Sequence, residues 1–206
     1  MKSKPRVPSV KLKSARPPVP SKDQGSYQFK VELEGSKPLI WRRIRVPGDF
    51  SLAALHVILQ DAMGWENCHM HEFRIGNAGY GSVAEGDDLF AQGMKSDRGA
   101  RLRDVLPPGK RTFRYIYDFG DDWVHKITVE EVLSPEAGAP PVLCLAGERA
   151  CPPEDCGGLY GYFDYLEILK NPGHSEYEEI KDWLGRHDPE RFDLDRVNTR
   201  LKRLAK

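Results

Sequence analysis

The alternation of apolar and polar residues predicts two strand hairpins. In YQFKVELEG (27–35) every second residue from Tyr27 to Leu33 is apolar, which is typical of a strand with one buried face. A turn at 35–38 and the segment LIWRRIRV (39–46) follow it. TFRYIYDF (112–119) and WVHKITVEEVL (123–133) flank a Gly-Asp-Asp turn and alternate in the same way. Each pair is expected to form an antiparallel hairpin.

The first hairpin is followed by a helical pattern and a further strand. Ser51 is a good N-cap, an apolar stripe runs from Leu52 to Met63, and Gly64 ends it. HMHEFRIG (69–76) predicts a short strand, so the order strand, strand, helix, strand resembles the start of a β-grasp unit. Residues 76–111 form a long glycine-rich loop.

The C-terminal third carries three helical patterns, which we expect to pack on the exposed face of the sheet. They centre on 162–169, 175–184 and 193–204. The chain is therefore predicted to be an α+β protein with a mostly antiparallel sheet. Residues 26–206 are expected to form a single domain.

Charge separates the first residues from the rest of the chain. The 206 residues contain 31 basic and 31 acidic side chains, but residues 1–24 hold seven of the bases and one acid. With five prolines and few large apolar residues, 1–25 is predicted to be a disordered basic tail, and 1–22 a possible contact for nucleic acid. The acidic remainder disfavours a general DNA binder.

No apolar run is long enough to span a membrane and no secretory signal is recognised, so a cytoplasmic protein is expected.

The segment CPPEDCGG (151–158) contains two of three cysteines that are candidate ligands of a structural zinc ion. Cys144, Cys151 and Cys156 have the spacing C-x6-C-x4-C, and only the second interval fits the usual zinc spacing. Three thiols need a fourth ligand, which His69, His71 or His125 could supply if the fold brings one of them near. The alternatives are a redox pair and a rigid loop with buried thiols, in which Asp155 caps the following helix.

Histidines and aspartates supply the other candidate chemistry. His69 and His71 lie on one face of the predicted strand, and His125 shares a face with apolar residues. Asp118 and Asp121 flank the second turn, where they are candidates for binding Mg²⁺ or Mn²⁺ for phosphodiester chemistry together with His125. Buried, hydrogen-bonded histidines and aspartates that stabilise a turn are the structural alternatives.

Four ordered segments resemble the root-inducing-plasmid open-reading-frame-three family. They are YQFKVELEGSKPLIWRRIRVP, MGWENCHMHEF, YIYDFGDDWVHKI and CPPEDCGGLYGY, and the resemblance extends from about Tyr27 to Leu204. It implies an α+β fold and an association with plasmids and mobile elements, where members carry labels such as transposon passenger or TnpR-like resolvase. The chain lacks the serine motif and the arginine–histidine–tyrosine set of recombinases, so recombination is not carried over.

The leading hypothesis is a non-enzymatic binding or accessory protein linked to mobile elements. In it, His69, His71 and His125 surround a recognition pocket. The alternatives are a metal-dependent enzyme acting on nucleic acid through Asp118, Asp121 and His125, and a domain with structural zinc on the 144–156 loop. The candidate binding residues are Trp65, His69, His71, Glu72, Asp118, Asp121, Trp123 and His125, and the candidate zinc ligands are Cys144, Cys151 and Cys156.

Overall fold

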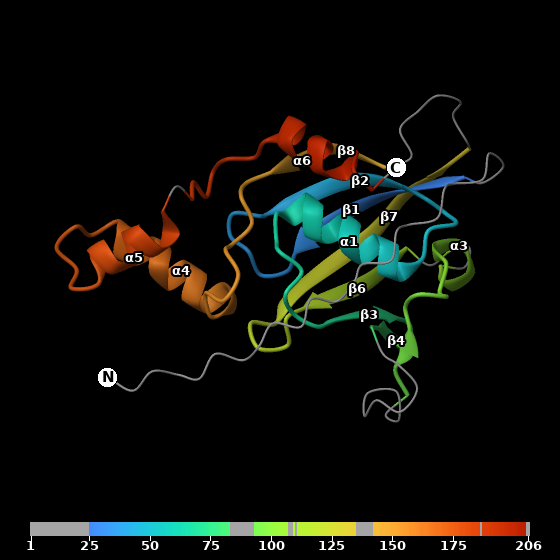
Figure 1. Cartoon of the computed structure of the whole chain (residues 1–206), viewed down its shortest axis with the longest axis horizontal. Coiled ribbons are helices and arrows are strands. Elements are labelled where there is room, and N and C mark those ends of the chain that lie inside the picture. The colour runs from blue at the N-terminus through green and yellow to red at the C-terminus, as the bar shows by residue number, and fades with distance from the viewer. Residues whose placement is uncertain are drawn as a thin grey trace.

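The protein is built on an eight-stranded sheet (Figure 1). The computed structural model describes residues 25–82, 93–106, 109, 111–134, 142–185 and 187–204. The strand order is β5-β4-β3-β6-β7-β1-β2-β8, and only the β4–β5 pair is parallel. The strands are β1 (Ser26–Leu33), β2 (Trp41–Pro47), β3 (His71–Ile75), β4 (Ala78–Gly81), β5 (Lys95–Ser96), β6 (Thr112–Tyr117), β7 (Trp123–Leu133) and β8 (Leu143–Glu148).

Both predicted hairpins are present, and the α+β class is confirmed. Phe29 of β1 pairs with Ile44 of β2, and Tyr115 of β6 pairs with His125 of β7. The order β1, β2, helix α1 (Leu52–Met63), β3 matches the predicted start. Within the sheet, however, the β6–β7 hairpin separates β3 from β1.

Helices α1 and α6 (Leu194–Leu201) lie on the same face of the sheet, over its central strands and its β8 edge (Figure 1). The Ser51 hydroxyl accepts a hydrogen bond from the Ala54 N–H, and Gly64 ends α1 with a left-handed conformation, as the sequence predicts. The apolar stripe of α1 packs onto the inward side chains of the strands, which include Phe29 and Ile44.

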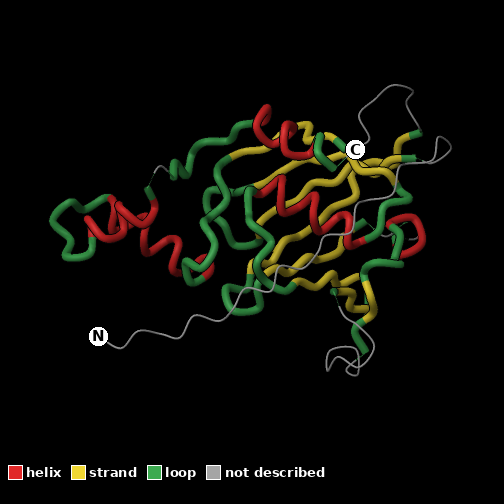
Figure 2. The backbone as a smooth tube through the Cα atoms, in the orientation of Figure 1, coloured by secondary structure: helices red, strands yellow, loops and turns green. Residues whose placement is uncertain are grey.

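The other two C-terminal helices do not lie on the sheet face, which corrects the prediction. Helices α4 (Gly158–Leu169) and α5 (Tyr177–Leu184) extend from one end of the sheet and pack on each other (Figure 2). Much of α5 is polar and exposed, so it has little apolar surface to bury against the strands.

Described parts of the segment 76–111 contain two strands that the sequence did not predict, and they also contain a short helix where Leu102–Leu106 predicts one helical turn. β4 pairs with β3, β5 pairs with β4, and the short helix α3 (Leu102–Val105) follows. The predicted basic tail lies outside the described residues, so its contact with nucleic acid stays a prediction.

Among the described residues, no helix has the length and apolar character that crossing a membrane requires.

Candidate functional site

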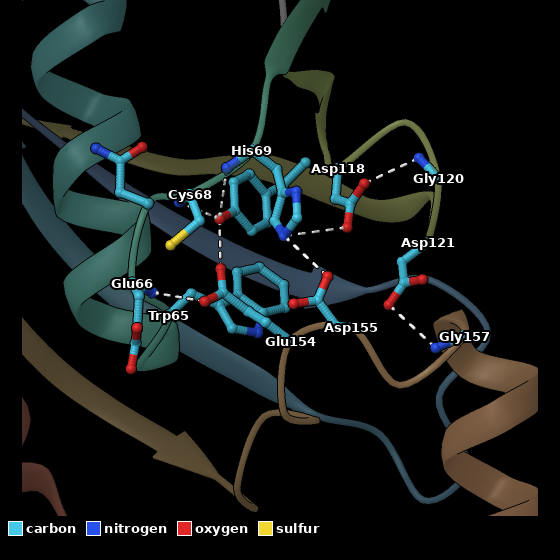
Figure 3. A network of polar contacts seen from close by, with 12 residues as sticks. Trp65, Glu66, Cys68, His69, Asp118, Gly120, Asp121, Glu154, Asp155 and Gly157 are labelled. Atoms are coloured by element: carbon cyan, nitrogen blue, oxygen red, sulfur yellow. Dashed lines mark hydrogen bonds and ion pairs between the residues drawn. The ribbon is translucent and has the colours of Figure 1, made fainter. Parts of the chain in front are cut away.

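Three segments that are far apart in the sequence meet at one end of the sheet (Figure 3). The first is the loop 64–70, which leads from α1 to β3. The second is the turn 118–122 between β6 and β7. The third is the loop 151–157, which precedes α4. These are the sequence motifs around HMH, DFGDD and CPPEDCG, so the structure brings three of the four family-like segments together.

The loop 151–157 is held against its neighbours by side-chain contacts at successive positions. The indole N–H of Trp65 donates to the carbonyl oxygen of Pro152 at 2.9 Å. The backbone N–H of Glu66 donates to Oε2 of Glu154 at 3.1 Å, and the Tyr117 hydroxyl donates to Oε1 of Glu154. The rigid Pro-Pro pair and these contacts together determine where Asp155 is presented.

Tyr117 joins all three segments. Its hydroxyl accepts hydrogen bonds from the backbone N–H groups of Cys68 (3.0 Å) and His69 (3.3 Å) while donating to Glu154. Burial and the adjacent Glu154 carboxylate both raise the pKa of Tyr117, so the hydroxyl stays protonated as a donor.

Replacing Tyr117 with phenylalanine is expected to lower the free energy of unfolding by about 1–3 kcal/mol, because two N–H groups and Glu154 lose a partner. Urea unfolding at neutral pH measures this. Tyr160→Phe is the matched control, since Tyr160 is 86% exposed. Equal effects of the two changes would contradict a bridging role for Tyr117.

The turn 118–122 docks on the start of α4. Oδ2 of Asp121 accepts a hydrogen bond from the Gly157 N–H at 3.2 Å. Gly157, and not Asp155, is the N-cap of α4, and glycine has no side chain that could accept a capping hydrogen bond. Asp155 therefore does not cap this helix, which corrects that interpretation, and its carboxylate is directed towards His69 instead (Figure 3).

His69, Asp118 and Asp155 form a compact cluster of possible metal ligands. Nε2 of His69 lies 3.2 Å from Oδ1 of Asp155 and 3.6 Å from Oδ2 of Asp118. The three ligand atoms are all within 4.8 Å of one another. Nε2 of His69 is buried, and among the described residues it has no hydrogen-bond partner of acceptable geometry. A ring nitrogen directed at two carboxylates without a hydrogen bond is the notable feature of this site.

The backbone at this junction is unusual. Asp118 (φ 56°) and Asp155 (φ 59°) both have a left-handed conformation, which non-glycine residues adopt rarely. Asn67 and Asp122, from the same segments, do so as well. The Gly120 N–H donates to Oδ1 of Asp118, which leaves Oδ2 directed at His69. Such backbone conformations persist where surrounding contacts enforce them, and they concentrate at functional sites.

A second group of possible ligands adjoins the first. Glu66, Cys68 and Glu154 also bring one ligand atom each within 4.8 Å of the others. Burial and the neighbouring carboxylates raise the pKa of Cys68, so its thiol stays protonated near neutral pH. Of these two groups, the first combines a histidine nitrogen that makes no hydrogen bond with two carboxylates.

The other predicted histidines belong to the interior rather than to an open pocket. His71 is 6% exposed, bonds Asp97 at 2.9 Å and stacks on His56 with ring centroids 3.6 Å apart. His125 is fully buried, and its Nδ1 bonds the carbonyl oxygen of Trp123 at 3.0 Å. A recognition pocket shared by His69, His71 and His125 is therefore not formed. His69 precedes β3, so its ring does not follow the strand alternation that we predicted.

The remaining predicted binding residues, Trp65, Glu72, Asp121 and Trp123, contact other parts of the fold. Trp65 and Trp123 are buried, with ring centroids 5.8 Å apart. Glu72 bonds the guanidinium of Arg74 on β3 and faces away from His71. Asp121 holds the start of α4. Asp118, Asp121 and His125 therefore do not converge as a metal-binding set in the described part of the chain.

The cysteines of the predicted zinc loop do not converge either. Among the described residues, Cys144, Cys151 and Cys156 form no group of neighbouring ligand atoms. Cys144 donates to the carbonyl of Ala146, and Cys156 to that of Gly158. Burial raises the pKa of Cys144 to about 11 and that of Cys156 to about 12, so both thiols stay protonated. This arrangement agrees with the alternative of a rigid loop with buried thiols.

Sequence reasoning missed three contributors to the site: Tyr117, Glu154 and, as a ligand candidate, Asp155. Tyr117 shares the alternation of its strand, so its position along the chain indicates only a core residue. Asp155 precedes a helix, which favours a capping role. One signal in the sequence could have identified them. Tyr117 directly precedes the candidate Asp118, and Glu154 and Asp155 lie between the candidate ligands Cys151 and Cys156, all within segments that resemble the family.

The fold and site define an α+β protein with a histidine–carboxylate cluster where three loops meet at one end of a mostly antiparallel sheet. Residues 25–196 match the family described as plasmid pRiA4b ORF-3-like protein, and the chain belongs to this family, as the resemblance implies. A relative from Sinorhizobium fredii (strain NBRC 101917 / NGR234), the uncharacterized protein y4hQ, is 38% identical over 162 residues. That alignment covers 78% of this chain and 81% of the relative.

A solved structure has the same fold. It is the protein of unknown function MM3350 from Methanosarcina mazei Go1, with a TM-score of 0.77 and 38% sequence identity. The match covers 84% of this chain and 97% of the other.

Proposed function

We propose that this protein binds one divalent transition-metal ion through His69, Asp118 and Asp155 and presents it to a ligand. The observation that carries the proposal is the buried Nε2 of His69, which has no hydrogen-bond partner among the described residues and faces two carboxylate oxygens. One nitrogen and two carboxylate oxygens suit Zn²⁺ or Mn²⁺ better than Mg²⁺, which prefers oxygen ligands.

The separations of the ligand atoms support this proposal. With metal–ligand bonds of about 2.1 Å, neighbouring ligands lie about 3.0 Å apart in octahedral and about 3.4 Å apart in tetrahedral geometry. The observed separations are 3.2 and 3.6 Å. Three protein ligands leave coordination positions for water or an external group, as in sites that bind a substrate. Asp155 is 75% exposed, so the open side faces solvent.

The proposal keeps the leading hypothesis of a binding protein and changes its site. The family description supports the association with plasmids. A metal-dependent nuclease needs the same ion and stays a prediction, but Glu66, Glu154 and Asp121 surround the cluster with negative charge. A phosphodiester backbone would be repelled there unless further cations took part.

Adding Zn²⁺ or Mn²⁺ to protein stripped of metal is expected to raise its melting temperature. At one hundred times the dissociation constant the ion adds about 2.7 kcal/mol to the free energy of unfolding. Calorimetric titration is expected to give one ion per chain, and Asp118→Asn or Asp155→Asn to weaken binding at least about a hundredfold. Asp164→Asn, at an exposed position on α4, is the matched control.

A simple ion pair between His69 and the two aspartates is the competing explanation. It predicts that neither metal changes the melting temperature of the wild type, of Asp118→Asn or of Asp164→Asn, and those results would overturn the proposal. Release of product from a generic phosphodiester in the presence of Mn²⁺, lost in Asp118→Asn, would favour the enzyme over the binding protein.

A further inference from the structure

A second site lies beyond the loop that contributes to the metal cluster. A pocket of about 240 Å³ opens between the C-terminal end of α1, Arg42 on β2 and the segment 187–200. Ala150 and Cys151, just before the Pro-Pro pair, also line it. Four arginines face this space, Arg42, Arg191, Arg196 and Arg200, together with three aspartates, Asp61, Asp188 and Asp193.

Arg42 is the unusual member of this lining, because its guanidinium is buried without an acidic partner. The residue is 2% exposed, and among the described residues no carboxylate lies within ion-pair distance of it. Its Nε donates to the carbonyl of Ala62, and Nη1 donates to the carbonyls of Trp41 and Glu148. Nη2 takes part in none of these bonds. A buried charge held only by neutral groups is costly unless a counter-charge approaches.

The aromatic ring of Phe192 fixes the orientation of this guanidinium, which lies 4.4 Å from the ring centroid. The carbonyl bonds hold it against the last turn of α1, where the helix dipole favours a cation. Arg42 is therefore preorganised, and an incoming anion has no rotamer entropy to remove from it.

Two of the three aspartates of the pocket interact with arginines of the same pocket, and the third accepts a hydrogen bond from a backbone N–H. Asp193 pairs with Arg191 at 3.3 Å and caps α6 by accepting from the Arg196 N–H. Asp188 accepts from the Glu190 N–H. Burial raises the pKa of Asp61, and the positive charges of Arg200 and Arg203 oppose this shift. Among the described residues, no carboxylate lies within ion-pair distance of Arg42 or Arg196, although the charge of Asp193 acts on Arg196 from further away.

We propose that this pocket binds a small organic anion through Arg42, Arg196 and Arg200, with a phosphate or carboxylate group against the buried guanidinium. Guanidinium groups recognise both oxyanions through paired hydrogen bonds. The volume exceeds that of a single phosphate, so a short organic chain fits beside the charged group. The inference is independent of the metal site, because no ligand candidate of that site lines the pocket.

The test compares anions at matched, low ionic strength and in the presence of a chelator. Melting temperature and calorimetric affinity are measured with inorganic phosphate, glycerol 3-phosphate and succinate, and with chloride as the reference. We expect saturable binding of one anion per chain by glycerol 3-phosphate or succinate. The preferred compound identifies the phosphate or the carboxylate as the recognised group.

Substitutions on α6 make the test specific to the pocket. Arg196→Gln and Arg200→Gln avoid the buried Arg42, so the fold is expected to survive, and each is expected to weaken binding about tenfold or more. Arg114→Gln, an exposed arginine on β6, is the matched control and keeps full affinity. Absence of saturable binding by all three anions would overturn the proposal. Equal affinity of the Arg196→Gln/Arg200→Gln double variant and the wild type would overturn it as well.

Discussion

Gly161→Ala is expected to destabilise the protein by about 3 kcal/mol or more and to abolish metal binding at the site proposed above. Gly161 lies in the first turn of α4, where a Cβ atom would overlap the carbonyl oxygen of Cys156. That oxygen belongs to the backbone of the loop that presents Asp155, so the overlap is relieved only when helix and loop move apart. Such a movement separates Asp155 from His69, which are 3.2 Å apart.

Gly158→Ala is expected to have a similar effect for two reasons. Its φ of 69° lies in the left-handed region, and a Cβ there would overlap the carbonyl oxygen of Asp121. Gly99→Ala is the control, because a Cβ at Gly99 has no neighbour within 4 Å. Urea unfolding and metal titration of the three variants measure both consequences. Wild-type metal affinity in Gly161→Ala would show that the loop does not position Asp155.

The second large effect is a loss of stability in mild acid, for which His125 is responsible. His125 is fully buried, and its Nε2 has no partner among the described residues. Burial lowers the pKa of His125 from 6.5 to about 4. The unfolded chain takes up a proton below pH 6.5, whereas the folded protein does so only near pH 4, so stability falls as the pH decreases through this window.

The expected loss from His125 is about 2 kcal/mol between pH 7.5 and pH 5, and about 3 kcal/mol at pH 4. His56 contributes with the same sign, because burial lowers its pKa well below 6.5. Urea unfolding between pH 7.5 and 5 measures the loss before most carboxylates titrate. His125→Gln is expected to reduce the slope even if its stability at pH 7.5 is lower, whereas His174→Gln, in the segment between α4 and α5, retains it. An unchanged slope in His125→Gln would contradict this assignment.

Most of the secondary structure and the family could be predicted from local patterns in the chain. Around Phe29 and Tyr115, apolar residues alternate with polar ones. This pattern directly indicates a strand with one buried face, because successive side chains of a strand point to opposite faces. The helix from Ser51 to Gly64 was predictable for a similar reason, since capping and the apolar stripe are local properties. The placement of α4 and α5 at the end of the sheet was not predictable, because it depends on which surface is left after α1 and α6 cover the strands.

Which polar residues meet depends on how the folded loops pack against one another. His69 and Asp118 were candidates from the sequence, but their neighbour Asp155 comes from a loop more than thirty positions further along the chain. The sequence pattern groups His69 with His71, yet the first precedes β3 and faces carboxylates, whereas the second begins the strand and is buried against His56. Contacts between distant segments depend on loop geometry, here on Trp65, Tyr117 and the glycines of CPPEDCGG, and no local pattern of residues encodes that geometry.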